Sequence, residues 1–289
     1  MFERMKTGWE LGLQSFGVLR HDKELVLFPL MSGAACLLVL TSFALPLWNT
    51  PWFHQFFDAQ DHQAPQNPIV YVILFAFYVV NYFVIVFFNA ALVSCALKRL
   101  AGGDPTVGYG LKQAMARLPQ IAAWAVVSGT VGLVLKMIES KSDKIGQLVA
   151  SLVGAGWAIA TYFVVPILVV EQVGPWQALK RSTSLIRRTW GEALVGNAGT
   201  GLLVMLGMIP GFISFVVGIV LFAANQPIAG GILFGLGAIW IALASLVGTA
   251  VQSILLTALY LYAAGGTTPP QFDESLLKQA FGSKKAKAV

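Results

Sequence analysis

Long apolar segments dominate the chain, and polar residues gather in short stretches between them. A helix needs about 20 residues, rising ~1.5 Å each, to cross a hydrocarbon core of roughly 30 Å. Because backbone groups find no water in that core, and because the alternation of a β-barrel is missing, each segment predicts a transmembrane helix. The six predicted spans are 25–48, 69–97, 118–135, 146–170, 193–224 and 231–264.

The last two predicted spans are longer than a membrane requires. At ~1.5 Å per residue, they would form helices of about 50 Å. A tilted helix is the favoured interpretation, and a broken helix is the alternative. Pro210-Gly211 and Gly248 are the expected break points, since proline removes a backbone donor and glycine tolerates unusual dihedral angles.

Basic residues alternate between the two sides of this arrangement. Of the 19 Lys and Arg residues, 16 fall in the N-terminal segment, the second and fourth connections and the C-terminal segment, and three fall in the third connection. Cytoplasmic loops carry the excess of Lys and Arg in membrane proteins. We therefore expect both termini to face the cytoplasm and the protein to reside in the cytoplasmic (inner) membrane of a prokaryote. We expect no cleavable signal peptide before Leu25.

Three of the predicted cytoplasmic segments combine an apolar stripe at helical spacing with basic flanks, which is typical of helices lying in the membrane interface. The stripes are Phe2, Met5, Trp9, Leu13 and Phe16; Leu111, Ala114, Met115 and Leu118; and Trp176, Leu179, Thr183, Ile186 and Trp190. Trp9, Trp176 and Trp190 are the expected interfacial anchors.

This order suggests a threefold internal repeat of an interfacial helix and a transmembrane hairpin, over 1–97, 98–170 and 171–264. Similar residues at 89–103 and 252–266 support a repeat, with chance similarity among apolar helices as the alternative. The fold class is thus an all-α polytopic membrane protein. It has a single integral membrane domain over 1–268 and a basic cytoplasmic tail over 269–289.

Composition agrees with a chain dissolved mostly in lipid. Hydrophobic residues make up 57 % of the sequence and charged residues 11 %, against about 25 % charged in soluble proteins. Mean hydropathy is +0.73, which argues against a disordered chain or a coiled coil. Cys36 and Cys95 lie within apolar runs and suggest neither redox chemistry nor metal binding. The net charge of +6 belongs to membrane loops, so no nucleic-acid partner is expected.

Several segments resemble a family of uncharacterised prokaryotic integral membrane proteins. They are Leu19–Leu25 with Phe28-Pro29, Phe88–Leu92 and Gly103–Thr106, and Val165-Pro166 with Glu171–Ser182 and Thr189–Glu192. Pro166, Glu171, Ala178-Leu179 and Ser182 are also similar to a wider set of six-span domains, including the membrane domain attached to some glycerophosphodiester phosphodiesterases. The resemblance implies a fold and a bilayer location but no reaction.

Glu171 is the most informative acid, because it ends the fourth span just before Gly174-Pro175. It can cap the following helix or pair with Lys180, Arg181 or another base, and a regulatory or transport role is the alternative. Basic side chains nearby are expected to contact lipid headgroups or a partner. These residues are Lys112, Arg117, Lys180, Arg181, Arg187 and Arg188.

Amide side chains inside the spans support two interpretations. Asn89, Asn197 and Gln252 are expected to hydrogen-bond between helices, and a polar pathway between repeat units is the alternative. Small residues four apart should let helices approach closely, within this chain or between copies. Such pairs are Ser128 and Gly132, Gly154 and Ala158, Gly196 and Thr200, Gly207 and Gly211, and Gly231 and Gly235.

Nothing in the sequence predicts catalysis or a cofactor. On a helix, His54, Asp58, Asp61 and His62 of the first external connection would share one face, as metal ligands can. Their spacing matches no specific metalloenzyme motif, and the aromatic residues around them favour an interfacial belt. Phosphate-loop, dinucleotide-binding and hydrolase motifs are missing. The expected function is a non-catalytic protein that organises anionic lipids or partner membrane proteins. The alternative is a transporter or lipid-translocating pathway, and the sequence leaves the oligomeric state open.

Overall fold

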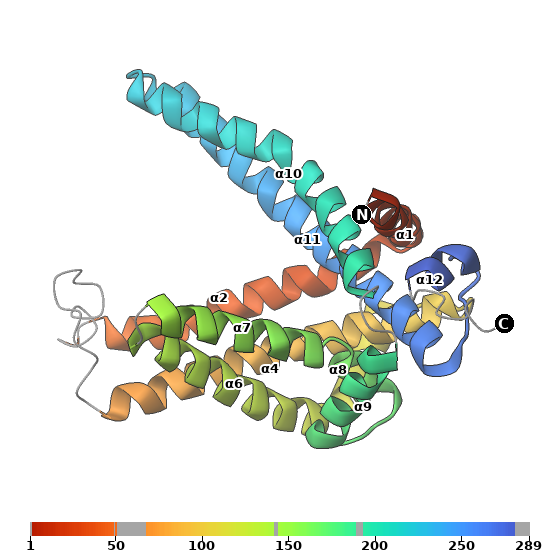
Figure 1. Ribbon diagram of the computed structural model, residues 1–289. Helices are drawn as coiled ribbons and strands as arrows, with labels where there is room; N and C mark the ends of the chain where they lie inside the picture. Colours follow the sequence, from red (N-terminus) through yellow and green to blue (C-terminus); the bar gives the residue numbers. More distant parts are fainter. Residues whose placement is uncertain (1, 49, 51–67, 142–143, 189–192, 281–289) are drawn as a thin grey trace. The chain divides into compact units, whose positions relative to one another are not determined.

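The computed structural model describes residues 2–48, 50, 68–141, 144–188 and 193–280, and every regular element in these ranges is a helix (Figure 1). Six helical segments are long and apolar enough to cross a membrane. They are Lys23–Leu47, Ile69–Leu100, Leu118–Glu139, Gly146–Val170, Thr200–Ala223 and Pro227–Gly265. Each coincides with one of the six apolar runs of the sequence.

The chain forms two compact units. Unit 1 comprises Met1–Pro29, Leu92–Tyr109 and Leu185–Val289, and unit 2 comprises Leu30–Ala91 and Gly110–Ser184. Helices α2 (Leu27–Leu47), α4 (Pro68–Leu100), α5 (Val107–Met115) and α9 (Pro175–Arg188) each contribute residues to both units.

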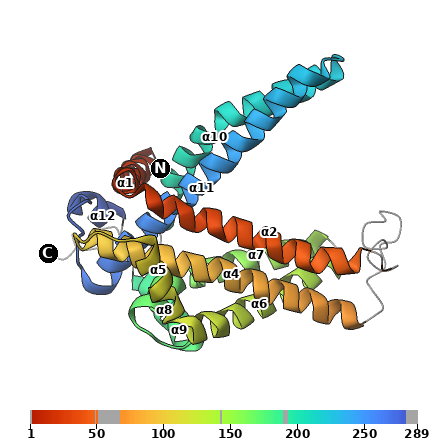
Figure 2. The same ribbon diagram turned by 180° about the vertical axis from the view of Figure 1, so that it is seen from behind.

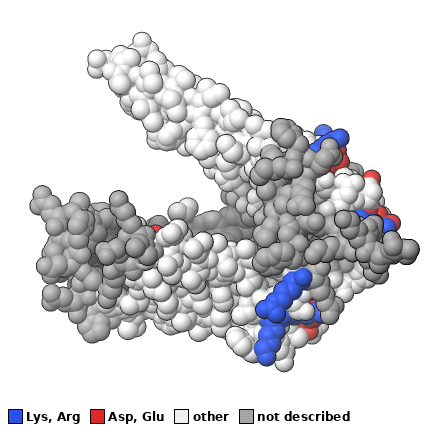
Figure 3. Space-filling model, viewed as in Figure 1, with Lys and Arg blue, Asp and Glu red and all other residues white. Residues whose placement is uncertain are grey.

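Unit 1 is built around a hairpin of α10 (Ala193–Ala223) and α11 (Pro227–Gly265). The hairpin carries no Lys, Arg, Asp or Glu, and its projecting end is white in Figure 3. Helix α1 (Phe2–His21) packs against α10 and α11, and the short helix α12 (Glu274–Ala280) packs against α1. A 3-10 turn, η1 (Lys23–Val26), follows α1 and leads into α2.

The two long helices of the hairpin are unbroken. Helix α10 continues through Pro210, and α11 runs through Gly248 without interruption. Two side-chain hydrogen bonds join the helices: the Trp240 indole N–H donates to the Gly207 carbonyl at 2.9 Å, and the Ser214 hydroxyl donates to the Leu233 carbonyl at 2.9 Å. In a medium without water, such bonds satisfy polar groups that have no other partner.

Unit 2 holds most of α2 and α4, which lie side by side in both views (Figure 2) and touch through Phe43 and Phe77. It also contains α6 (Leu118–Lys141), α7 (Lys144–Ala160), α8 (Val164–Val170) and most of α9. Helices α6 and α7 form a second hairpin, with Trp124 and Trp157 stacked at 5.8 Å between ring centroids.

The fourth predicted span differs from a single continuous helix, because α7 ends at Ala160 and α8 begins at Val164. Pro166 accounts for part of this break. It has no N–H to donate one turn back, and its ring fits the first turn of a new helix. The Thr161 hydroxyl donates to the Trp157 carbonyl at 2.8 Å, which compensates the end of α7.

Candidate functional site

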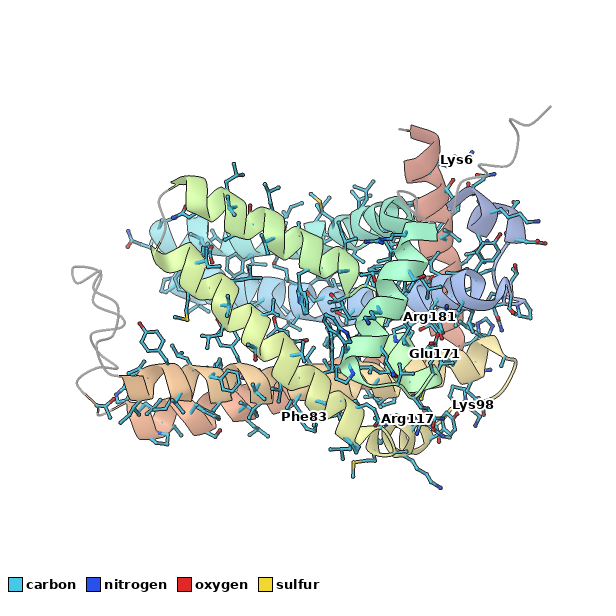
Figure 4. The ribbon with its side chains drawn as sticks, turned by 60° about the horizontal axis from the view of Figure 1, so that its bottom comes forward. Lys6, Phe83, Lys98, Arg117, Glu171 and Arg181 are labelled. Carbon is cyan, nitrogen blue, oxygen red and sulfur yellow. The ribbon has the colours of Figure 1, made fainter. Side chains whose placement is uncertain are left out.

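The α8–α9 corner, residues 171–174, joins the end of the fourth span to α9. Glu171 follows α8 directly, and Gln172 adopts a left-handed backbone with φ 57°. Arg181, two turns into α9, donates from Nε to Glu171 Oε1 at 3.0 Å. Figure 4 shows the two side chains directed toward each other. Glu171 therefore pairs with Arg181, one of the predicted partners, and this ion pair connects α9 to the end of α8.

Arg117 lies just before α6 and supports the same corner from another side. Its Nε donates to the Val169 carbonyl at 3.4 Å, at the C-terminal end of α8. The last carbonyls of a helix have no partner within the helix, and a cation there also complements the helix dipole. Arg117 and Arg181 thus act as structural contacts within unit 2.

Ser182 sets the rotation of α9 about its own axis. The side chain is completely buried, and its hydroxyl accepts a hydrogen bond from the Phe163 N–H at 3.1 Å. Phe163 belongs to the break between α7 and α8, where this N–H lies at the start of a helix. Together with buried Ala178, Ser182 defines the inward face of α9 in unit 2.

The opposite face of α9 is open. The Trp176 side chain is 67 % exposed, and Lys180 Nζ lies 5.6 Å from the centroid of its ring. A cation at this distance is attracted by the electrons of the indole. In Figure 3, Lys and Arg side chains gather over the α9 end of unit 2. The Trp176 ring and the Lys180 ammonium group therefore share one exposed surface of α9, and Ser182 and Arg181 hold the rest of the helix in place.

Helix α5 contributes a similar pair of residues to unit 2. Lys112 is exposed and Met115 is 57 % exposed, whereas Ala114 is buried. The apolar residues predicted to form one stripe therefore lie on two faces of α5: Met115 faces outward beside Lys112, and Ala114 faces inward.

The six predicted headgroup-contact residues therefore fall into two groups. Arg117 and Arg181 are engaged in contacts within the fold, while Lys112, Lys180 and Arg187 are exposed. The side chain of Arg188 lies outside the described residues. Of the predicted anchors, Trp176 is exposed and Trp9 is half-buried on α1, and Trp190 lies outside the described residues.

Two of the three amides of the predicted polar pathway have described side chains, and these two belong to different units. Asn89 is half-buried in unit 2, and Gln252 is exposed in unit 1. The side chain of Asn197 lies outside the described residues. A polar pathway therefore stays a prediction from the sequence.

A second charged cluster, which the sequence did not single out, lies in unit 1. Arg99, near the end of α4, pairs with both carboxylate oxygens of Asp22, and its Nη2 donates to Asp104 at 2.6 Å. The Arg99 carbonyl accepts a hydrogen bond from Gln271 Nε2 at 3.2 Å. Asp22 and Asp104 both lie in segments that carry the family resemblance. That resemblance is the sequence feature that could have pointed to this cluster.

Nearby, Lys98 Nζ lies 4.5 Å from the centroid of the Tyr109 ring, and Thr106 Oγ1 accepts from the Tyr109 N–H at the start of α5. This cluster joins the end of α4, the α1–η1 junction and the chain after α11 into one polar network.

Within the described ranges, no group of three or more His, Cys, Asp and Glu side chains could hold a metal ion. His54, Asp58, Asp61 and His62 lie outside those ranges. Cys36 and Cys95 are both free thiols.

Comparison with known families adds one result. Residues 68–270, more than half of the chain, match the model of a family of unknown function (DUF6159). The chain belongs to this family. The family region contains the α8–α9 corner, the exposed face of α9 and Arg99, whereas α1 and α12 lie outside it. No curated protein matches the sequence.

Proposed function

We propose that this protein is a non-catalytic multi-pass protein of the cytoplasmic membrane that holds anionic lipids, and with them partner membrane proteins, at its cytoplasmic surface. The observation that carries the proposal is the exposed face of α9. Trp176 and Lys180 are open on a helix whose other face is fixed by the Ser182 hydrogen bond and the Arg181–Glu171 pair. Tryptophan favours the headgroup level of a bilayer, and lysine is attracted to anionic headgroups.

Helix α1 supports the proposal independently. Small and apolar side chains, among them Leu11 and Ser15, form its buried face, while Leu13 is 48 % exposed and Phe16 is 36 % exposed. Exposed Lys6 and Arg20 flank these two apolar residues. Because η1 connects α1 directly to the first span, the chain itself keeps α1 close to a membrane surface. An exposed apolar stripe with basic flanks suits the boundary between headgroups and acyl chains.

The electrostatic contribution of such a surface is additive and modest. Each suitably placed base contributes about 1 kcal/mol near an anionic leaflet. Lys112 and Lys180 would therefore each enrich anionic lipid severalfold at their own positions. The proposal also includes a similarity in fold and membrane location to the membrane domains of glycerophosphodiester phosphodiesterases, which is expected from the sequence.

The test replaces both exposed lysines of unit 2 in the full-length protein. Lipids retained after mild detergent extraction are quantified by mass spectrometry for the Lys112→Gln/Lys180→Gln variant. The matched control is Lys136→Gln/Lys278→Gln, which removes the same charge from lysines already paired with Glu139 and Glu274. We expect the ratio of phosphatidylglycerol to phosphatidylethanolamine to fall severalfold in the first variant and to stay unchanged in the control. An unchanged ratio in the first variant would overturn the proposal.

A further inference from the structure

Residues 267–280, here called the C-terminal strap, turn back onto α1 after the last span. Helix α11 ends in a left-handed glycine, Gly266, with φ 67°, and its N–H donates to the Tyr262 carbonyl at 2.8 Å. The strap then places α12 against α1 (Figures 1 and 2). Helices α1 and α12, which are far apart in the sequence, therefore meet within unit 1.

Specific contacts hold the strap in place. The Thr7 hydroxyl donates to Gln279 Oε1 at 3.2 Å, and Gln14 Oε1 accepts from the Asp273 N–H at 3.2 Å. Phe272 and Leu277 are both buried. These contacts link α1 to the strap at two points separated by two helical turns, and they involve the side of α1 away from Leu13 and Phe16.

The strap has the properties of a two-state element. Helix α12 has seven residues, and a helix this short does not persist alone in water, so it is helical only while docked. Asp273 caps it through Oδ1, which accepts from the Ser275 N–H at 2.7 Å. Hydrogen bonds from Ser275 lower the pKa of Asp273, so the cap is charged at neutral pH. Undocking and unfolding of α12 are therefore the same event.

We propose that the C-terminal strap is a conformational switch that sets how firmly α1 is held in unit 1. Helices α10 and α11 hold one side of α1, where the Thr200 hydroxyl donates to the Gly8 carbonyl at 3.3 Å, and the docked strap holds the side that carries Thr7 and Gln14. Release of the strap leaves α1 on α10 and α11 alone, so that Leu13 and Phe16 are held outward less firmly. This inference rests on the proposed function, because it assigns the strap control over the membrane contact of α1. Both α1 and α12 lie outside the residues that match the family model.

The experiment compares two neighbouring alanine substitutions in the full-length protein, reconstituted in phosphatidylglycerol-containing nanodiscs. Leu277→Ala removes the buried contact, and Lys278→Ala, at an exposed position, is the matched control. Hydrogen exchange is followed by mass spectrometry in residues 7–15. We expect exchange in Leu277→Ala to quicken by about tenfold or more, as for other large-to-small core substitutions, and in Lys278→Ala to stay unchanged. Unchanged exchange in α1 of Leu277→Ala would overturn the switch.

A second measurement separates the switch from the proposed function. A fluorescent label at Leu13→Cys, in a Cys36→Ala/Cys95→Ala background, is exposed to brominated lipids. Quenching that is strong in the parent and weaker in Leu277→Ala supports control of membrane contact by the strap. Quenching that stays equally strong in Leu277→Ala overturns that control. A label unquenched in the parent would contradict membrane contact by α1, and the exchange measurement would still decide whether the strap orders α1.

Discussion

At the scale of single residues, neighbouring cations of one helix have different surroundings. Lys180 is exposed above Trp176, whereas Arg181 is paired with Glu171 at 3.0 Å. The sequence predicted the same headgroup contact for both, because their types and positions are equivalent in a helical pattern. Only the position of Glu171, which depends on the turn after α8, distinguishes them. A pairing of Glu171 with a nearby base was therefore predictable, and which of the two bases takes part was not.

The Asp22–Arg99 pair yields a prediction at the same scale. The Asp22 side chain is 8 % exposed and receives both of its hydrogen bonds from Arg99, so Arg99→Gln would leave a buried carboxylate without its cation. Breaking a buried ion pair costs about 3–5 kcal/mol, and the partial exposure of Arg99 reduces this to roughly 2–3 kcal/mol. Thermal unfolding in detergent should show a lower midpoint for Arg99→Gln.

The double variant Asp22→Asn/Arg99→Gln is the control, since it removes both charges and keeps groups that can hydrogen-bond. Its midpoint should recover most of the loss. Equal losses in the single and double variants would show that the pair itself does not stabilise unit 1.

At the scale of elements, the sequence was most informative about helix length and least informative about helix faces. Hydropathy predicts spans because a helix in lipid must be apolar over about 20 residues. The break between α7 and α8 was not predicted, although Pro166 accounts for part of it. The other contact at the break joins Phe163 to Ser182, which lies 19 residues further along the chain. The small-residue pairs were also only partly informative: Gly211 lies against α11, whereas the space around Gly207 is open.

The α10–α11 hairpin provides an element-scale prediction. A Cβ at Gly218 would lie 2.5 Å from the Phe234 backbone nitrogen, so Gly218→Ala must push the helices apart. Overpacking of this kind costs about 1–3 kcal/mol. Gly207→Ala, in the same helix, meets no atom within 4 Å and is the matched control. Thermal unfolding in detergent should distinguish the two variants. A midpoint for Gly218→Ala equal to that of the control would contradict the close packing.

At the scale of the whole molecule, the described residues contain six apolar helical segments, each of which overlaps one of the spans that the sequence predicted. Which side each connection faces is still inferred from the distribution of Lys and Arg, since hydropathy and length say nothing about orientation. The proposed lipid-binding surface depends on that orientation, because Lys112 and Lys180 must face the cytoplasm and Lys136 the opposite side.

Substituted-cysteine labelling measures this orientation directly. Lys136→Cys and Lys180→Cys, each in the Cys36→Ala/Cys95→Ala background, replace exposed lysines on connections of opposite predicted side. A membrane-impermeant maleimide should label residue 136 in intact cells and residue 180 only in inverted membrane vesicles. Labelling of residue 180 in intact cells, or of both positions from the same side, would contradict the account.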